Sequence, residues 1–509
     1  MSQSPLPTAP EARFFDSSPW LMRIAVGLIF LAGLVLRLYD LDDPPMDFHP
    51  TRQMHSALIA RGMFYADLET VPDWQRERAV QQQRAQGLIE PQIMETLTAS
   101  AYRLVGNADL RIPRLFSILF WSLGGFGLFL LSKDLAGSNA GVVALLLYMT
   151  LPYGVVASRA FQPDPLMTAM LVWSWWGMAR WLHWRTWGWA FFAGISAGLA
   201  IYIKSTALFF VLGAWVGLLL AGMGIRAVLR ERQVWLITGL SLLPFAAYHI
   251  YATFVIGLLQ DQFSLRFFPG MWLDPVFYLR WQVKAAQVVA LPWLVIGVMG
   301  LFVLRDKAWR GLLTGAWLGY GIYALLLSYY ISTHDYYHLP LIPLAAIGVG
   351  LATQALFSAL NGPRLWINLV IPALLLALLL SQTWEARSIL KSNDYRPVVE
   401  QVEQISAMFK PQDRVVSLAE DYSTHLRYWG WLDATHWFGI GDFELRELAG
   451  QPVDLLTYFE QQTSGRDYFL ITDFVELERQ PELNRMLDEH FPVLRQGEGY
   501  WVYDLRKKK

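Results

Sequence analysis

The sequence contains no cysteine, which excludes disulfides, thiolate metal sites and cysteine nucleophiles. Charged residues are also scarce, since they make up 16% of the chain and the formal net charge is −1. A chain this close to neutrality has no basic field of the kind that binds nucleic acid. So little charge is also atypical of soluble globular proteins, in which about 25% of residues are charged.

Apolar and aromatic residues are abundant instead. Hydrophobic residues make up 54% of the chain, and 23 Trp, 22 Tyr and 29 Phe suit the aromatic belts of a membrane interface. A spanning helix needs roughly 20 apolar residues. About eleven windows approach this length: 21–38, 112–132, 139–157, 164–182, 187–203, 206–223, 234–256, 287–304, 311–331, 338–357 and 365–384. The sequence therefore predicts an α-helical polytopic membrane protein.

Two segments near the N-terminus are not predicted to span the membrane. Residues 1–20 are polar and rich in Pro and Ser, without the basic region of a cleaved signal peptide. The window 21–38 is therefore predicted to be a retained first span. Segment 92–106 is too short to cross and carries Glu95 and Arg103. We predict that it is an amphipathic helix lying on the membrane surface.

Lys and Arg are distributed unequally between the two sets of loops. With a cytoplasmic N-terminus, the inside loops contain Lys133, Arg180, Arg185, Arg226, Arg230, Arg232, Arg305, Lys307, Arg310 and Arg364. The short outside loops contain Arg159 and Lys204. This positive-inside asymmetry predicts a multi-pass protein of the cytoplasmic (inner) membrane with segments 39–111, 257–286 and 388–509 outside.

The last 120 or so residues differ in composition from the rest. Short apolar runs at 415–418, 468–472 and 500–503 read as strands, and they alternate with amphipathic helical runs at 396–409, 453–462 and 481–490. Alternating helices and strands predict a small C-terminal α/β soluble domain. It contains no phosphate-binding glycine motif, so a structural or acceptor-facing cap is the expected role.

Ionisable residues cluster where the chain first leaves the membrane. Asp47, His49 and Arg52 follow Pro44-Pro45 immediately after the first predicted span. Ionisable groups at a membrane face are expensive to desolvate and usually serve a function. The cluster is therefore a candidate site.

Several short motifs occur in a recognisable order along the chain. They are Leu36-Arg37-Leu38-Tyr39, Pro44-Pro45 with its acidic neighbours, Glu90-Pro91, the helix 92–106, Arg111-Ile112-Pro113-Arg114, Pro163-Asp164, residues 198–204 and residues 335–343. In this order they resemble the GT-C superfamily of membrane glycosyltransferases, in particular the bacterial branch similar to protein O-mannosyltransferases and the lipid A aminoarabinose transferase. The resemblance covers about residues 20–350. It implies transfer of a sugar from a polyprenyl-phosphate carrier to an acceptor on the outer face of the membrane, with inversion at the anomeric carbon.

The sequence contains candidates for the two functions that such a reaction requires, a general base and positive charge for the lipid phosphate. The acceptor hydroxyl needs a general base, and the outside carboxylates Asp47 and Asp164 are candidates. The leaving group is a lipid phosphate, for which Arg52, Arg159 and Lys204 could supply positive charge.

Other candidates have two interpretations each. Arg111 and Arg114 either clamp the phosphate or anchor a span by snorkelling. Glu90 is either a second carboxylate of the site or a polar start to the surface helix. Asp164 would also stabilise a helix dipole at the start of its span. Between two later spans, Asp335, Tyr336 and His338 are expected to contact sugar or phosphate.

The chain departs from the family pattern in its first loop. Members of the family commonly have an adjacent Asp-Glu where this sequence has His49-Pro50. An imidazole can accept a proton near neutral pH. The identity of the base is therefore open between Asp47 and His49. The participation of a divalent metal is open for the same reason, and no other cofactor is indicated.

These observations predict three parts: a cytoplasmic tail (1–20), a GT-C transmembrane glycosyltransferase domain (21–385) and a periplasmic α/β domain (386–509). The expected partners are a polyprenyl-phosphate sugar donor, a lipid, glycan or protein acceptor, and the bilayer. Two alternatives remain. One is a lipid-linked sugar transporter or flippase, and the other is a glycan ligase. A transporter would place ionisable residues near the membrane midplane. The predicted spans have interiors nearly free of charge, which favours an enzyme.

Overall fold

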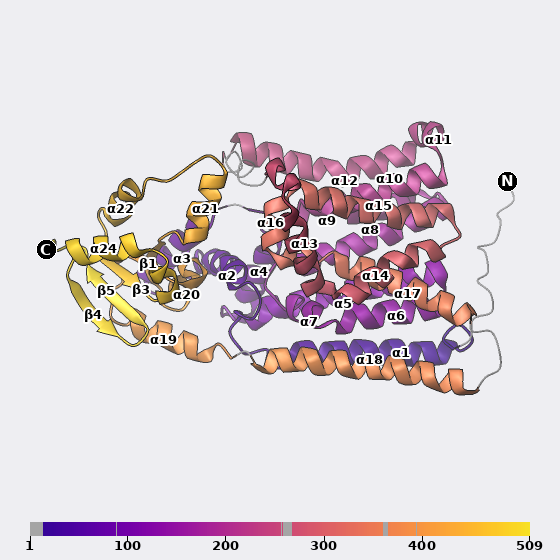
Figure 1. Cartoon of the computed structure of the whole chain (residues 1–509), viewed down its shortest axis with the longest axis horizontal. Helices are drawn as coiled ribbons and strands as arrows, with labels where there is room; N and C mark the ends of the chain where they lie inside the picture. The colour runs from indigo at the N-terminus through magenta and orange to yellow at the C-terminus, as the bar shows by residue number, and fades with distance from the viewer. Residues whose placement is uncertain (1–13, 88, 256, 258–266, 360–364, 393) are drawn as a thin grey trace.

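The computed structural model describes residues 14–87, 89–255, 257, 267–359, 365–392 and 394–509. Most of the tail 1–20, part of the loop 257–286 and Arg364 lie outside these residues. Figure 1 shows a long bundle of roughly parallel helices with a small sheet beyond one end. The bundle and sheet confirm the expected fold class.

The bundle is built from helices that coincide with the predicted apolar windows, apart from one short helix at 225–230 in a predicted inside loop. They are α1 (Pro19–Leu38), α5 (Arg111–Ala136), α6 (Ser138–Thr150), α7 (Pro152–Ala157), α8 (Asp164–Trp184), α9 (Trp187–Ile203), α10 (Ala207–Gly222), α11 (Ile225–Arg230), α12 (Arg232–Ile250), α14 (Leu291–Met299), α15 (Lys307–Leu326), α16 (Ser328–Thr333), α17 (Leu341–Ala359) and α18 (Leu365–Ser392). The short turns η1 (Tyr251–Val255), η3 (Gly300–Val303) and η4 (Asp335–His338) extend some of them. α1 and α18 lie side by side along one edge of the bundle (Figure 1).

Not every helix is long enough to cross a membrane alone. Among the described residues, five helices pass by length and apolar composition, or six if the bent pair Pro275–Val289 and Leu291–Val303 forms one span. The number of spans, about eleven by window length, therefore stays a prediction. Other predicted windows are divided into shorter helices. Window 139–157, for example, contains α6 and then α7, which begins at Pro152.

The window 287–304 is not the continuous span that its composition suggests. Helix α13 (Pro275–Val289) follows the short turn η2 (Pro269–Leu273), and it begins where the Asp274 side chain accepts a hydrogen bond from the backbone N–H of Val276. It ends at Ala290, whose φ is +50°, and the next helix leaves at an angle of 89°. Much of the predicted outside loop 257–286 is therefore helical.

Close packing of α10 against α15 depends on glycines. A Cβ atom added at Gly315 would collide with the carbonyl oxygen of Gly213, and one at Gly311 would collide with that of Gly217. Small residues at this spacing let two backbones approach directly, as in many membrane helix pairs. The pair α10 and α15 thus forms a close-packed unit along one side of the bundle.

The first long connection contains three helices that lie between the bundle and the sheet (Figure 1). They are α2 (Pro50–Tyr65), α3 (Asp73–Ala85) and α4 (Ile93–Val105). The helix predicted at 92–106 is present as α4, which ends at Gly106 with φ +83°. Helix α2 was not expected from the sequence. Its surface is largely buried, and it packs against α3 and α4.

The C-terminal part is a five-stranded sheet with helices on both faces. Its strands are β1 (Arg414–Leu418), β2 (Asp433–His436), β3 (Tyr468–Ile471), β4 (Val493–Gly497) and β5 (Tyr500–Asp504). Their order is β2-β1-β3-β5-β4, with β1 parallel to β2 and β3 and with β5 antiparallel to β3 and β4. The helices are α19 (Arg396–Ser406), α20 (Thr424–Tyr428), α21 (Ile440–Leu448), α22 (Leu455–Thr463), α23 (Phe474–Glu478) and α24 (Pro481–His490), with the turn η5 (Glu420–Ser423).

Alternate strand residues enter two separate cores because side chains alternate between the faces of a sheet. Val416 and Phe469 pack with α22 and α24 on one face. Val415 and Leu470 pack with α19 on the other. The predicted pattern of strands and helices therefore corresponds to an α/β sandwich.

The C-terminal part is fastened to α2 and α3. Arg61 of α2 donates hydrogen bonds to the backbone carbonyls of Arg427 and Tyr428, and its guanidinium lies 3.9 Å from the ring centre of Trp431. Gln82 of α3 donates to the carbonyl of Leu432 at 3.0 Å. These contacts hold α20 and the start of β2 against the helices of the first loop.

Candidate functional site

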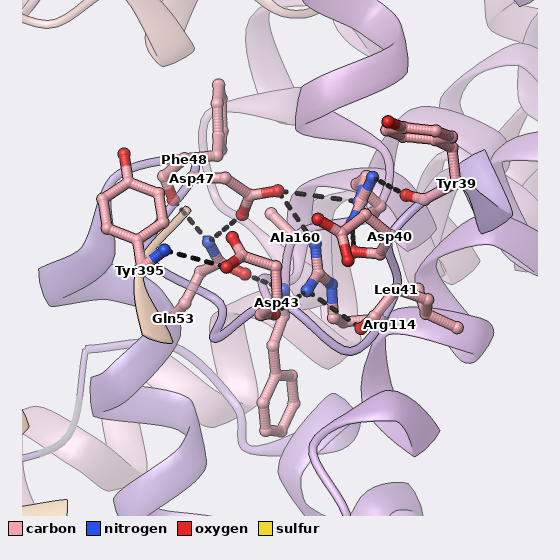
Figure 2. Close-up of polar contacts among 12 residues, drawn as sticks. Tyr39, Asp40, Leu41, Asp43, Asp47, Phe48, Gln53, Arg114, Ala160 and Tyr395 are labelled. Atoms are coloured by element: carbon pink, nitrogen blue, oxygen red, sulfur yellow. Dashed lines mark hydrogen bonds and ion pairs between the residues drawn. The ribbon is translucent and has the colours of Figure 1, made fainter. Parts of the chain in front are cut away.

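Asp47 is buried beside two arginines from other elements. Its side chain is 3% exposed, and Oδ2 lies 2.8 Å from Nη2 of Arg114 and 3.5 Å from Nε of Arg159. Gln53 donates to Oδ1 at 3.3 Å (Figure 2). Both carboxylate oxygens of Asp47 are therefore already engaged.

The same arginines hold the start of the first loop. Arg114 donates to the carbonyl of Asp43 at 2.6 Å (Figure 2). Arg159 donates to the carbonyls of Tyr39 and Asp40 at 2.7 and 2.8 Å. The Asp47 cluster thus ties the end of α1 to α5 and to the turn after α7, and its carboxylate pairs with two guanidinium groups that are 1% exposed.

His49 forms a separate pair with a residue far along the chain. Its Nε2 lies 2.6 Å from Oδ1 of Asp335, and both side chains are about a quarter exposed, at 29% and 24%. The ring packs edge-on against Tyr336, with ring centres 4.6 Å apart. His49 has φ +45° and stands at the N-terminus of α2, where Pro50 starts the helix. This backbone turn directs the imidazole toward η4.

The charge of Asp335 determines which imidazole nitrogen is protonated. Burial raises the pKa of Asp335, but hydrogen bonds from His49 and Tyr153 and the charges of His49 and Lys284 outweigh it and hold this pKa below its ordinary value. An ionised carboxylate only accepts hydrogen bonds, so Nε2 of His49 donates to it. In the neutral imidazole Nδ1 therefore carries the lone pair, and this atom makes no hydrogen bond to the part of the chain that the structure describes.

A cavity of about 320 Å³ is lined by Tyr337, the residue after Tyr336, and does not include His49 or Asp335 in its lining. Arg52, Glu90 and Lys204 line its polar end. Arg52 pairs with Glu90 at 2.6 Å, and Lys204 pairs with buried Asp164 at 2.9 and 3.0 Å. Burial raises the pKa of Glu90, but Arg52 and Lys204 together outweigh this effect and hold the pKa below its ordinary value.

Two cationic side chains and two hydroxyl residues stand at this end of the cavity. Nε of Arg52 is buried without a hydrogen-bond partner among the described residues. Nζ of Lys204 lies 4.9 Å from the ring centre of Tyr336 and 5.4 Å from that of Tyr337. Ser205 and Thr206, just before α10, also line the cavity. This end of the cavity suits an anionic group.

An apolar groove continues from the cavity between α10 and α15. Leu208 and Phe209 line both spaces, and the groove has a volume of about 530 Å³. Its outer side chains face away from the bundle, since Leu220, Leu318 and Ile322 are more than half exposed. The Gly213–Gly315 contact forms its floor.

Of the predicted site residues, Arg52, Glu90 and Lys204 line the cavity, and the others lie outside its lining. Arg111 is 55% exposed and pairs with Asp109 and Asp42. Arg114 and Arg159 belong to the Asp47 cluster. His338 is fully buried, with hydrogen bonds to the hydroxyl of Tyr320 and the carbonyl of Ile331.

Several neighbours of the site were not expected from the sequence. Tyr330 and Tyr337 line the cavity, and Asp421 of the C-terminal part accepts a hydrogen bond from Thr51 of α2 at 3.3 Å. The Ser205-Thr206 pair before an apolar helix was a usable signal, because Ser and Thr favour helix starts. Nothing in the local sequence marks Asp421. No group of three or more His, Asp or Glu side chains in the described ranges could hold a metal ion.

Comparison with known proteins identifies the fold. Residues 90–251 match the family model of dolichyl-phosphate-mannose-protein mannosyltransferases. No curated protein sequence matches the chain significantly. Among solved structures, ArnT from Cupriavidus metallidurans bound to undecaprenyl phosphate is similar, with a TM-score of 0.58 and 16% identity over 94% of this chain and 98% of that one.

Two further structures have the same architecture. The oligosaccharyltransferase AglB from Archaeoglobus fulgidus, in complex with an inhibitory peptide and a dolichol-phosphate, gives a TM-score of 0.54 at 10% identity, covering 96% of this chain and 74% of that one. The arabinofuranosyltransferase AftD from Mycobacteria gives 0.51 at 16% identity, covering 97% of this chain and 40% of that one. The expected resemblance to the GT-C superfamily is confirmed, and at these identities the structural likeness concerns the fold.

Proposed function

We propose that this chain, which has the fold of GT-C glycosyltransferases, transfers a sugar from a polyprenyl-phosphate-linked donor to an acceptor hydroxyl, with inversion. One observation carries the proposal: a cavity with Arg52 and Lys204 at its polar end continues into an apolar groove on the side of the bundle. A phosphate joined to a long hydrocarbon chain has the same division into an anionic and an apolar part. The ligand named with the similar ArnT structure, undecaprenyl phosphate, has this chemistry.

The donor would occupy both spaces at once. Its phosphate would lie between Arg52 and Lys204, at the polar end of the cavity. Its first isoprene units would cover Leu208 and Phe209 and continue along α10 and α15. Lipid tails are as apolar as leucine, so moving the isoprene units from the bilayer into the groove gains no hydrophobic free energy; the groove supplies packing, and the cations supply affinity and position.

The proposed reaction is a single displacement at the anomeric carbon. Nδ1 of His49 accepts the proton of the acceptor hydroxyl, whose oxygen forms a bond to the anomeric carbon. The bond from that carbon to the phosphate oxygen breaks, and its electron pair remains on the phosphate. The phosphate gains one negative charge in this step, which Arg52 and Lys204 stabilise. Asp335 keeps the imidazole oriented and stabilises its protonated form.

We also propose the predicted orientation and domain boundaries for this chain: a cytoplasmic tail to residue 20, a transmembrane domain 21–385 and an outside domain 386–509 in the cytoplasmic membrane. The sheet lies beyond one end of the bundle, and α11, with Arg226 and Arg230, lies at the other (Figure 1). The positive-inside rule associates such basic connections with the cytoplasm.

Cysteine labelling tests this orientation, because the chain contains no native cysteine. A cysteine at Ser464 should react with an impermeant maleimide in intact cells, whereas one at Lys133 should react only after the membrane is opened. The opposite pattern would invert the topology. A cysteine at exposed Glu447, in the same domain as Ser464, provides a matched control.

Replacing Lys204 by methionine should weaken donor binding while leaving the cavity's size nearly unchanged. A charge-assisted hydrogen bond is worth about 1.5–3 kcal/mol. We therefore expect the KM for an undecaprenyl-phosphate sugar to rise about ten- to a hundredfold, measured in lipid nanodiscs by release of undecaprenyl phosphate.

The controls for this variant separate local from general effects. Lys391→Met removes an exposed lysine at the end of α18 and should leave KM unchanged. The double variant Lys204→Met, Asp164→Asn removes the carboxylate left unpaired and should restore stability without restoring donor affinity. Wild-type KM in Lys204→Met would remove Lys204 from the donor site.

A further inference from the structure

The loop after β1 has an unusual backbone. Asp421, Tyr422 and Ser423 have φ values of +52°, +55° and +59°, and none of them is glycine. Consecutive non-glycine residues in the left-handed region are unfavourable and persist only when the surroundings enforce them. This loop stands at the carboxyl end of the parallel strands β2, β1 and β3, where open α/β sheets commonly bind ligands.

Side-chain contacts enforce the loop. The hydroxyl of Tyr422 donates to Asp442 at 2.8 Å, and its ring packs on His436 with centres 4.7 Å apart. Ser423 and Ser417 share a hydrogen bond of 2.8 Å, and Thr424 donates to the carbonyl of Asp421 at 2.8 Å. With its neighbours anchored in this way, the Asp421 side chain reaches the first turn of α2.

That turn carries the residues of the proposed reaction. Asp421 Oδ1 accepts from the hydroxyl of Thr51 at 3.3 Å. Thr51 stands between His49, which pairs with Asp335, and Arg52, which lines the cavity. Oδ2 of Asp421 makes no hydrogen bond to the described part of the chain.

We propose that Asp421 binds the acceptor, holding its hydroxyl-bearing part beside His49; this inference rests on the proposed glycosyl transfer. A carboxylate oxygen accepts hydrogen bonds from neighbouring hydroxyls of the acceptor, so the loop selects a hydroxylated substrate. The C-terminal part would thereby supply part of the binding site.

Docking of the C-terminal part does not require this residue. Arg61, Arg78 and Gln82 already attach it to α2 and α3 through hydrogen bonds to backbone carbonyls. The hydrogen bond from Thr51 to Asp421 is longer than the bonds made by Arg61, Arg78 and Gln82, and it joins a single pair of atoms. Docking of the C-terminal part alone would not require the left-handed backbone of Asp421, Tyr422 and Ser423.

Ionisation of Asp421 gives the proposal a pH signature. Burial first and then the charge of Glu420 raise the pKa of Asp421 to about 6, with a small contribution from Asp473, while Thr51 and His49 oppose the increase. The carboxylate form predominates above this pKa. Acceptor binding should therefore weaken as pH falls through about 6, and removing the charge of Glu420 should move this loss to lower pH.

The test uses the full chain in lipid nanodiscs with a labelled undecaprenyl-phosphate sugar and an envelope extract of the source cells as acceptor. Asp421→Asn keeps the left-handed backbone accessible, since asparagine also tolerates it. We expect the half-saturating amount of extract to rise about tenfold, which corresponds to about 1.4 kcal/mol. Donor KM and release of free sugar to water should stay unchanged, so the ratio of transfer to hydrolysis falls.

Two further variants distinguish acceptor binding from docking. Thr51→Val removes the contact but keeps the carboxylate, and it should retain most of the transfer ratio. Glu420→Gln should shift the acid limb of acceptor binding to lower pH. An unchanged ratio in Asp421→Asn, or an equal loss in Thr51→Val, would overturn the inference. No release of label from any donor by the wild-type chain would overturn the proposed function, and this inference with it.

Discussion

Replacing His49 by glutamine should lower kcat about 10²- to 10⁴-fold, the usual worth of general-base catalysis. Glutamine can still contact Asp335 but cannot accept the proton of the acceptor hydroxyl. The Nε2–Asp335 distance of 2.6 Å and the uncommitted Nδ1 are the reasons for this expectation. Single-turnover transfer at saturating donor measures the effect directly, and donor KM should remain close to that of the wild type.

Asp335→Asn is the companion variant, because it removes the charge that selects the imidazole tautomer. Turnover should fall as it does in His49→Gln, again without loss of donor affinity. Normal turnover in His49→Gln would contradict the assignment. In that case Asp164, paired with Lys204 beside the cavity, would be the carboxylate to examine next.

Replacing Asp47 by asparagine should affect stability first. The change leaves Arg114 and Arg159, each 1% exposed, without their carboxylate. Removing one partner of a buried ion pair typically costs about 3–5 kcal/mol. We expect this loss in the free energy of unfolding, measured in detergent by chemical denaturation, together with a clearly lower Tm.

The matched control is Asp42→Asn, which removes a carboxylate that is 71% exposed and paired with exposed Arg111. Its effect should stay within about 0.5 kcal/mol. A stable Asp47→Asn protein with turnover reduced a hundredfold or more would instead identify Asp47 as the base. The two variants of the first loop therefore distinguish a structural carboxylate from a catalytic one.

The sequence predicted the helical membrane architecture and much of the C-terminal sheet because both have local signals. Strands β1, β3 and β5 are apolar runs and coincide with predicted segments. Strand β2 reads Asp-Ala-Thr-His and β4 is largely exposed, so neither has the apolar pattern of a strand. Helix α2 was missed because it is buried among neighbours on several sides and lacks an apolar stripe.

The site depended on contacts that no local pattern reveals. His49 and Asp335 are 286 positions apart, and Asp47 meets Arg114 from 67 positions away. The sequence could indicate that these residues lie at the same membrane face, but it left the base open between Asp47 and His49. Burial and pairing of the two side chains in the folded chain are the basis on which we now favour His49.

The most direct test of glycosyl transfer follows both halves of the donor. Purified chain in nanodiscs would receive undecaprenyl-phosphate sugars labelled in the sugar, with an envelope extract as acceptor. We predict that released undecaprenyl phosphate equals the sum of acceptor-linked and free label, with the anomeric configuration of the acceptor-linked sugar inverted. Label that stays on undecaprenyl phosphate but crosses the bilayer when the chain is placed in sealed vesicles would contradict it and identify a transporter.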